Sequence, residues 1–115
     1  MRKVLDSTKI AGPALQSIET FHNQIVGEVE AAVASNAYVV VGMRQNPVVK
    51  SALKALSEKN ITYKYMEYGS YFSKWKQRLS LKLWSGWPTF PMVFVDGKLI
   101  GGGAELKAHL ASKAQ

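Results

Sequence analysis

Three short segments carry the residue types from which a binding or catalytic site could be built. They are residues 44–47 (Arg-Gln-Asn-Pro), residues 87–91 (Trp-Pro-Thr-Phe-Pro) and the glycine run 101–103. An arginine can bind a carboxylate, and backbone N–H groups at the start of a helix can receive an anion. The chemistry open to these segments is therefore that of holding an anionic ligand.

The chain has no cysteine. This excludes disulfides, a thiol nucleophile, cysteine-ligated metals and iron–sulfur ligation by the chain. His22 and His109 are far apart in the sequence, with no carboxylate or second histidine at ligand spacing. We therefore expect no metal site and interpret both histidines as helix-surface residues.

Charge points to anionic partners. Fifteen Lys and Arg against eight Asp and Glu give a net charge of +7, with a cluster at Lys74, Lys76, Arg78 and Lys82. Such an excess favours anionic partners in general, although a charge excess alone is usually just a soluble basic surface. An acidic protein is one candidate partner. No specific nucleic acid is expected, because no DNA- or RNA-binding motif accompanies the charge.

The sequence predicts no membrane association. Its longest apolar stretch, around residues 37–41, is too short to cross a bilayer, and its first residues lack the apolar segment of a signal peptide. A cytoplasmic location is the resulting expectation.

The elements that must position these segments can be predicted from residue spacing. We expect an N-terminal arm over residues 1–12 and one domain over residues 13–115. Apolar residues at steps of three and four predict a first helix over 13–35; they are Leu15, Ile18, Phe21, Ile25, Val29 and Val33. The β-branched run 38–41 predicts a buried strand.

The second half of the pattern is equally regular. Asn46-Pro47 predicts a helix start, and the alternating residues 61–66 predict a parallel second strand. A third helix is expected over residues 71–84, with four apolar residues on one face: Phe72, Trp75, Leu79 and Leu83. Residues 92–100 predict a hairpin turning at Asp96-Gly97, and a last helix follows over 104–112.

This order resembles the thioredoxin fold, and three local motifs resemble glutaredoxins. Residues 87–102 match the family's Thr-x-Pro, hairpin and Gly-Gly pattern, in a spelling similar to the monothiol branch. Residues 46–49 (Asn-Pro-Val-Val) stand where the family carries Cys-Pro-Tyr-Cys or a one-cysteine version. The resemblance covers about residues 37–110. It implies an α/β three-layer sandwich, in which helices cover both faces of a four-stranded mixed sheet, with an extra N-terminal helix and a cis Pro91.

The resemblance also implies a groove for glutathione, in which Arg78 stands where the family places Arg or Gln. The implied ligand-binding residues are Arg44, Asn46, Arg78, Phe90, Pro91, Gly102 and Gly103. Two departures weaken this expectation, because Met43 takes the more usual position of the basic residue and the aspartate after Gly-Gly is absent unless Glu105 replaces it.

Asn46 in place of the nucleophilic cysteine decides the chemistry. Family activity needs a thiolate at the helix start, whereas an amide is no nucleophile toward a disulfide. We therefore expect no catalytic residue and no required cofactor, with glutathione or an extended peptide as a ligand. The alternative is an interaction module that uses the basic third helix beside a vestigial groove. An enzyme using glutathione's own thiol is a third hypothesis, but no motif places Tyr38 or Tyr68 beside the groove.

Each site residue also has a purely structural interpretation. Asn46 can serve only as a helix cap, Pro91 as a turn residue and the Gly101-Gly102 pair as a close-packing contact. Arg78 can be one more solvated helix cation.

Overall fold

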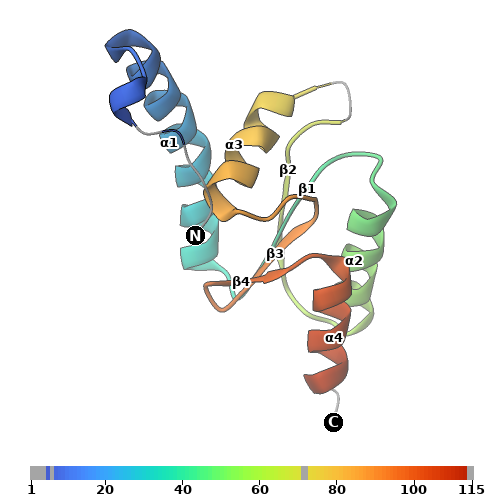
Figure 1. Ribbon diagram of the computed structural model, residues 1–115. Helices are drawn as coiled ribbons and strands as arrows, with labels where there is room; N and C mark the ends of the chain where they lie inside the picture. The colour runs from blue at the N-terminus through green and yellow to red at the C-terminus, as the bar shows by residue number, and fades with distance from the viewer. Residues whose placement is uncertain (1–4, 6, 71–72, 114–115) are drawn as a thin grey trace.

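The computed structural model describes residues 5, 7–70 and 73–113, and Figure 1 shows the order of their elements. A 3₁₀ turn at Ser7–Lys9 precedes the first helix. The helices are α1 (Gly12–Ser35), α2 (Pro47–Glu58), α3 (Trp75–Ser85) and α4 (Gly103–Lys113). The strands are β1 (Tyr38–Gly42), β2 (Lys64–Glu67), β3 (Met92–Val95) and β4 (Lys98–Gly101).

The strands form one mixed sheet in the order β2-β1-β3-β4. Strand β1 pairs in parallel with β2 and antiparallel with β3, which pairs antiparallel with β4. In the register, Val40 lies between Tyr65 on one side and Val93 on the other. The predicted architecture of a four-stranded mixed sheet is therefore confirmed.

Helices cover both faces of this sheet (Figure 1). Ile25 and Val29 of α1 and Leu81 of α3 pack on one face with Val39 and Val41. The alternate β1 residues Tyr38 and Val40 face the other side, where Leu56 of α2 and Leu106 of α4 cover them. The unbroken β-branched run of β1 is buried throughout because both of its faces meet a helix layer.

Strand β2 is shorter than the alternating pattern predicts. It begins at Lys64 rather than residue 61. The Ile61 N–H still bonds to the Leu56 carbonyl at 3.0 Å, and Asn60 has a φ of 57°, so these residues complete the end of α2. Ile61 and Tyr63 pack against the α2/α4 core without joining the sheet, which explains the misleading alternation.

Helix α3 begins later than predicted and turns its predicted apolar face outward. Lys74 has a left-handed φ of 56°, so the helix starts at Trp75. Trp75, Leu79 and Leu83 share a face as predicted, yet they are 58%, 47% and 63% exposed. Phe72 lies outside the described residues. Arg78 and Leu81 are buried instead.

The remaining elements follow the sequence pattern closely. Asp96 and Gly97 have φ values of 50° and 84°, which confirms the hairpin turn between β3 and β4. Helix α1 begins one residue before its predicted start, and its first half reaches beyond the sheet in Figure 1. Ile18 in that half is 53% exposed. Among the described residues, no helix is both long and apolar enough to span a membrane.

Candidate functional site

Asn46 caps helix α2, as the Asn46-Pro47 pair predicts. Its Oδ1 accepts hydrogen bonds from the N–H groups of Val48 at 2.9 Å and Val49 at 3.1 Å. Pro47 has no N–H to satisfy and fits the first turn. The side chain therefore occupies the donors at this helix start that would otherwise face an anion.

The same side chain joins α2 to the turn before β3. Asn46 Nδ2 donates to the Phe90 carbonyl at 3.5 Å, a long hydrogen bond. The Phe90–Pro91 peptide bond is cis, and both residues are buried. Phe90 and Pro91 thus lie against the start of α2, as the sequence predicts for residues of one site.

Two glycines bring the start of α4 into the same place. A Cβ on Gly102 would lie 3.2 Å from the Pro91 carbonyl oxygen, and one on Gly103 would lie 2.7 Å from Val48 Cγ1. The second distance is too short for any side chain to fit without movement. Asn46, Phe90, Pro91, Gly102 and Gly103 therefore converge, with α4 packed closely against the turn before β3 and the start of α2.

Glu105 takes part in this cluster through its carboxylate. Glu105 Oε1 accepts the Gly102 N–H at 2.8 Å, so the third residue of α4 reaches back to the helix start. The interaction uses one of the N–H groups that the sequence comparison offered to a ligand. Whether Glu105 replaces the absent aspartate in binding stays a prediction.

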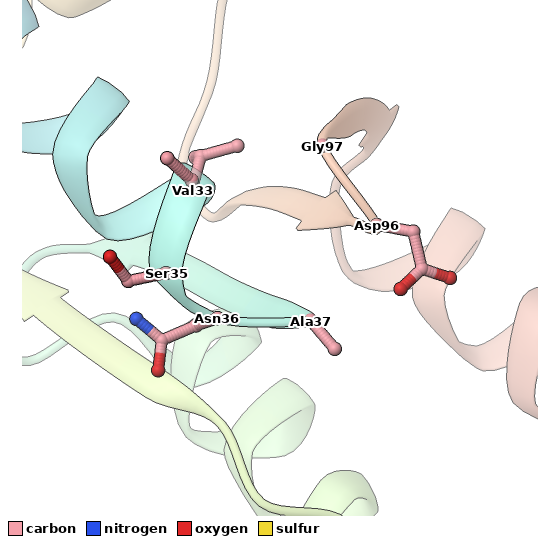
Figure 2. A pocket seen from close by; sticks show the side chains of 7 residues that line it. Val33, Ser35, Asn36, Ala37, Asp96 and Gly97 are labelled. Carbon is pink, nitrogen blue, oxygen red and sulfur yellow. The ribbon is translucent and has the colours of Figure 1, made fainter.

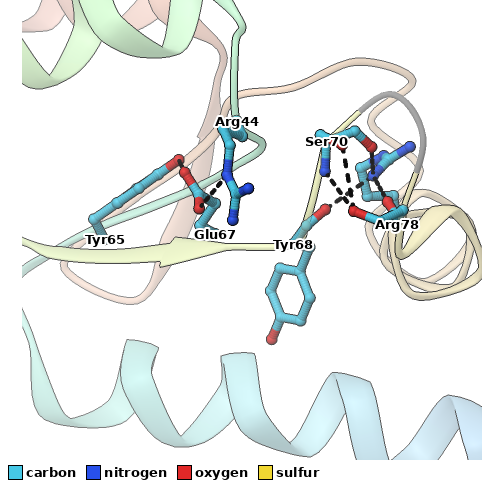
Figure 3. Close-up of polar contacts among 7 residues, drawn as sticks. Arg44, Tyr65, Glu67, Tyr68, Ser70 and Arg78 are labelled. Carbon is cyan, nitrogen blue, oxygen red and sulfur yellow. Dashed lines mark hydrogen bonds and ion pairs between the residues drawn. The ribbon is translucent and has the colours of Figure 1, made fainter.

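Arg78 has a different role from the solvated helix cation. It is 8% exposed, and its Nη1 donates to the carbonyls of Tyr68 at 2.9 Å, Ser70 at 2.6 Å and Ser73 at 2.6 Å (Figure 3). The guanidinium therefore fixes the segment between β2 and α3. Within the described part of the chain, none of its hydrogen bonds reaches Asn46, Phe90 or the glycines. Binding of a ligand carboxylate by Arg78 stays a prediction.

Arg44 lies beside that segment and remains solvent-exposed. Its N–H bonds to the Gly69 carbonyl at 2.6 Å, and its Nε is 3.5 Å from Glu67 Oε2 (Figure 3). The side chains of this ion pair are 66% and 36% exposed, so the pair contributes only about 0–1 kcal/mol. Tyr65 donates to the other Glu67 oxygen at 3.1 Å. Partial burial is the main cause that raises the pKa of Tyr65, and this hydrogen bond is the second. Arg44 can exchange Glu67 for another carboxylate at little cost.

The tyrosine hydroxyls considered for chemistry have partners of their own. Tyr68 donates to Glu28 of α1 at 2.9 Å, and burial together with that bond raises the pKa of Tyr68. Tyr38 Oη lies 3.4 Å from His109 Nε2, with the two rings edge to face. His109 is consequently half-buried rather than a fully exposed helix residue. Among the described residues, no three His, Cys, Asp or Glu side chains form a metal-binding group.

Trp87 is a site neighbour that sequence reasoning did not assign. Its Nε1 is buried with no hydrogen-bond partner among the described residues, and it would lie 3.5 Å from a Cβ on Gly102. The ring packs on the α1/α3 side of the core. Its place in the Trp-Pro-Thr-Phe-Pro motif was the only available indication.

A surface hollow of about 500 Å³ lies at the opposite end of β1 from Asn46. Val33 and Asn36 of the α1–β1 junction line it with Asp96 and Gly97 of the hairpin turn (Figure 2). A second hollow follows α1 from Gln16 to Gln24. Neither hollow includes a residue of the Asn46 cluster.

Residues 39–100 match the family model described as glutaredoxin. The chain belongs to the glutaredoxin family. A glutaredoxin-like protein of Dictyostelium discoideum is 53% identical over 85 residues, which cover 74% of this chain and 69% of that protein. The family assignment predicted from the motifs is confirmed.

Solved glutaredoxin structures have the same fold. Oxidised glutaredoxin 2 of Chlamydomonas reinhardtii superposes with a TM-score of 0.68 at 26% identity, over 80% of this chain and 87% of that one. Buckwheat glutaredoxin in complex with glutathione gives a TM-score of 0.70 at 23% identity, over 83% and 87% of the two chains. These matches confirm the thioredoxin-like sandwich. That Asn46 stands where the family carries its redox cysteine stays a prediction from the motif at residues 46–49.

Proposed function

We propose that this glutaredoxin-family chain is a non-catalytic binding domain, which holds glutathione or an extended peptide beside Pro91 without thiol chemistry. The observation that supports the proposal is the convergence of five of the predicted site residues, which are Asn46, Phe90, Pro91, Gly102 and Gly103. No metal or other cofactor is required.

Asn46 accounts for the missing reaction and for the retained framework. Disulfide exchange needs a thiolate that attacks sulfur and leaves it again, and no carboxamide does this. The same carboxamide satisfies the N–H groups of Val48 and Val49, which would stabilise a thiolate in a reactive glutaredoxin. The local structure is therefore kept while the chemistry is lost.

The groups that remain available indicate weak binding. The Phe90 carbonyl accepts a long hydrogen bond, and the Arg44 side chain forms an exposed ion pair. Other donors are already engaged, namely the α2 start by Asn46 and the Gly102 N–H by Glu105. A ligand must displace these contacts, so we expect a dissociation constant of about 1 mM.

An NMR titration with reduced and oxidised glutathione tests the proposal. The amides of Phe90, Gly102 and Gly103 should shift, while the hairpin amide of Gly97 should not. Arg44→Ala should weaken binding about threefold, because an exposed carboxylate contact is worth less than 1 kcal/mol. Lys98→Ala on the exposed hairpin is the matched control. Unmoved site amides at about 10 mM ligand would refute the proposal.

A gained activity gives a second, independent test. Asn46→Cys places a thiol at the start of α2, where the helix dipole lowers a thiol pKa. The variant should form a mixed disulfide with oxidised glutathione at least about tenfold faster than Ser57→Cys, because Ser57 lies near the other end of α2. Mass spectrometry of timed samples measures both rates. Equal rates would mean that the site no longer favours glutathione.

A second candidate function is docking of a protein partner on α3. The exposed line of Trp75, Leu79 and Leu83 favours it.

A further inference from the structure

The outer face of α3 carries three large apolar side chains in a line. Trp75, Leu79 and Leu83 are four residues apart and are 58%, 47% and 63% exposed. Residues at this spacing lie one above another on a helix, so the three form a continuous strip that we call the α3 ridge. Single exposed apolar residues are common on soluble proteins, whereas a contiguous strip marks an interaction surface.

Lysines border the α3 ridge on both sides. At 3.6 residues per turn, Lys76 and Lys82 fall on opposite flanks of the line through Leu79. The Lys76 ammonium lies 5.8 Å from the centroid of the Trp75 ring. Helix α3 contains no acidic residue, and the sequence has none between Glu67 and Asp96. The helix therefore presents an apolar strip flanked by positive charges, and it has no acidic side chain to neutralise them.

The remaining cation of α3 holds the ridge in place. Arg78 points inward and binds three carbonyls of the segment before the helix, as Figure 3 shows. Leu81 is fully buried in the core behind the ridge. The outer face is thus presented on a fixed support, which lowers the entropic cost of binding.

We propose that the α3 ridge is the docking surface for an acidic amphipathic segment of a partner protein. Apolar side chains of that segment, at helical spacing, would cover Trp75, Leu79 and Leu83. Flanking Asp or Glu side chains would pair with Lys76 and Lys82. Complementary charge speeds association and sets the register, and an exposed tryptophan is a frequent anchor of protein interfaces.

Two other occupants fit the ridge less well. A second copy related by a two-fold axis would place the same lysines against one another, and like charges oppose such a contact. A membrane-surface helix presents a broad apolar face, whereas this ridge is one side chain wide on a helix whose other face is buried.

The α3 ridge adjoins the candidate site. Lys82 Nζ lies 5.7 Å from the centroid of the Phe90 ring, and Phe90 directly precedes Pro91. A bound segment could therefore continue toward the site. The docking proposal does not depend on glutathione binding, because its contacts are all on α3.

Calorimetric titration with a synthetic peptide tests the proposal. The peptide has leucines at steps of three and four with glutamates between them, and a scrambled peptide of equal composition is the reference. The Leu79→Ser/Leu83→Ser double variant should bind the peptide at least about tenfold more weakly than the native chain. Glutathione titration of that variant should be unchanged, which separates this proposal from the proposed function.

Charge reversal supplies a matched pair of variants. The Lys76→Glu/Lys82→Glu variant should bind the acidic peptide about tenfold more weakly than the native chain. It should instead bind a peptide that has lysine in place of glutamate. Lys50→Glu/Lys107→Glu changes the net charge equally on the other face of the sheet and should alter binding by less than about twofold.

Several results would overturn the proposal. One is that the acidic peptide does not bind at about 1 mM. Another is that the ridge variants bind the peptide as tightly as the native chain does. Sedimentation with phosphatidylserine vesicles and ultracentrifugation of the protein alone complete the set. Ridge-dependent vesicle binding in the absence of peptide binding would assign the surface to membranes, and ridge-dependent self-association would assign it to a second copy.

Discussion

The start of α2 and the outer face of α3 differ in how their side chains are used. Around Asn46, the N–H groups at both helix starts have partners within the chain, which are Asn46 for those of Val48 and Val49 and Glu105 for that of Gly102. On α3, three large apolar side chains have little cover. The region that resembles an active site is thus internally satisfied, while the region with unused binding capacity lies beside it.

This difference separates what a family resemblance transfers from what it does not. Backbone geometry transfers, because Pro91, Gly102 and Gly103 pack in the same small space. Thiol reactivity does not transfer, because the chain has no cysteine. Substitutions that probe stability in one region and binding in the other sharpen the contrast.

Arg78→Met should give a large loss of stability. Removing the guanidinium leaves the carbonyls of Tyr68, Ser70 and Ser73 without their shared donor, at a cost of about 3 kcal/mol. Urea denaturation followed by circular dichroism measures the change. Lys76→Met, an exposed cation on the same helix, is the control and should stay within about 0.5 kcal/mol. Similar losses in both variants would remove the structural role of Arg78.

Tyr68→Phe should cost about 1 kcal/mol at neutral pH, because it deletes the hydrogen bond that joins the residue after β2 to Glu28 of α1. The pKa of Tyr68 is raised in the folded chain by burial and by this bond. Above pH 10 the unfolded tyrosine loses its proton first, so the native chain loses stability as the pH rises. Between about pH 8 and 11, the denaturation midpoint should fall less steeply with pH in Tyr68→Phe than in the native chain. Parallel curves would contradict this assignment.

Asn46→Ala should destabilise the fold by about 1 kcal/mol, because the N–H groups of Val48 and Val49 lose their cap. Asn46→Ser keeps a capping oxygen and should cost less than about 0.5 kcal/mol. Thermal denaturation distinguishes them. If both variants lose equally, the capping interpretation of Asn46 fails.

Leu79→Ser should have the smallest effect on stability, within about 0.5 kcal/mol, because its side chain is half exposed. Leu81→Ser on the same helix removes a fully buried side chain and should cost at least about 3 kcal/mol. A large loss in Leu79→Ser, measured by the same denaturation, would mean that the ridge serves folding rather than binding.

The sequence predicted elements whose local chemistry decides their structure. Asn46-Pro47 starts α2 because amide capping and the fixed proline φ act within one turn, and Asp96-Gly97 forms the hairpin because both residues take positive φ. The prediction of a strand over residues 61–63 was wrong. Their apolar residues pack against the α2/α4 core, while the Ile61 N–H still bonds to the end of α2.

The α3 face and Arg78 show what spacing alone does not decide. Apolar residues at the spacing of Trp75, Leu79 and Leu83 usually face the core of a protein. In this fold, Arg78 and Leu81 are buried instead. The carbonyls that make this burial acceptable come from the turn after β2, whose geometry no local pattern encodes. The family motifs indicated that the residues around Pro91 lie together, but they did not indicate that Arg44 and Arg78 contact the segment after β2 instead.

The sheet order has a consequence for how the protein behaves at high concentration. With β1 and β3 in the centre, β2 and β4 form the two open edges, and each is only four residues long. Lys64 and Lys98 lie exposed on these edges. Short edge strands that carry lysines resist pairing with the strands of other molecules. The edges of the sheet therefore disfavour aggregation by strand pairing, even though the α3 ridge is exposed to solvent.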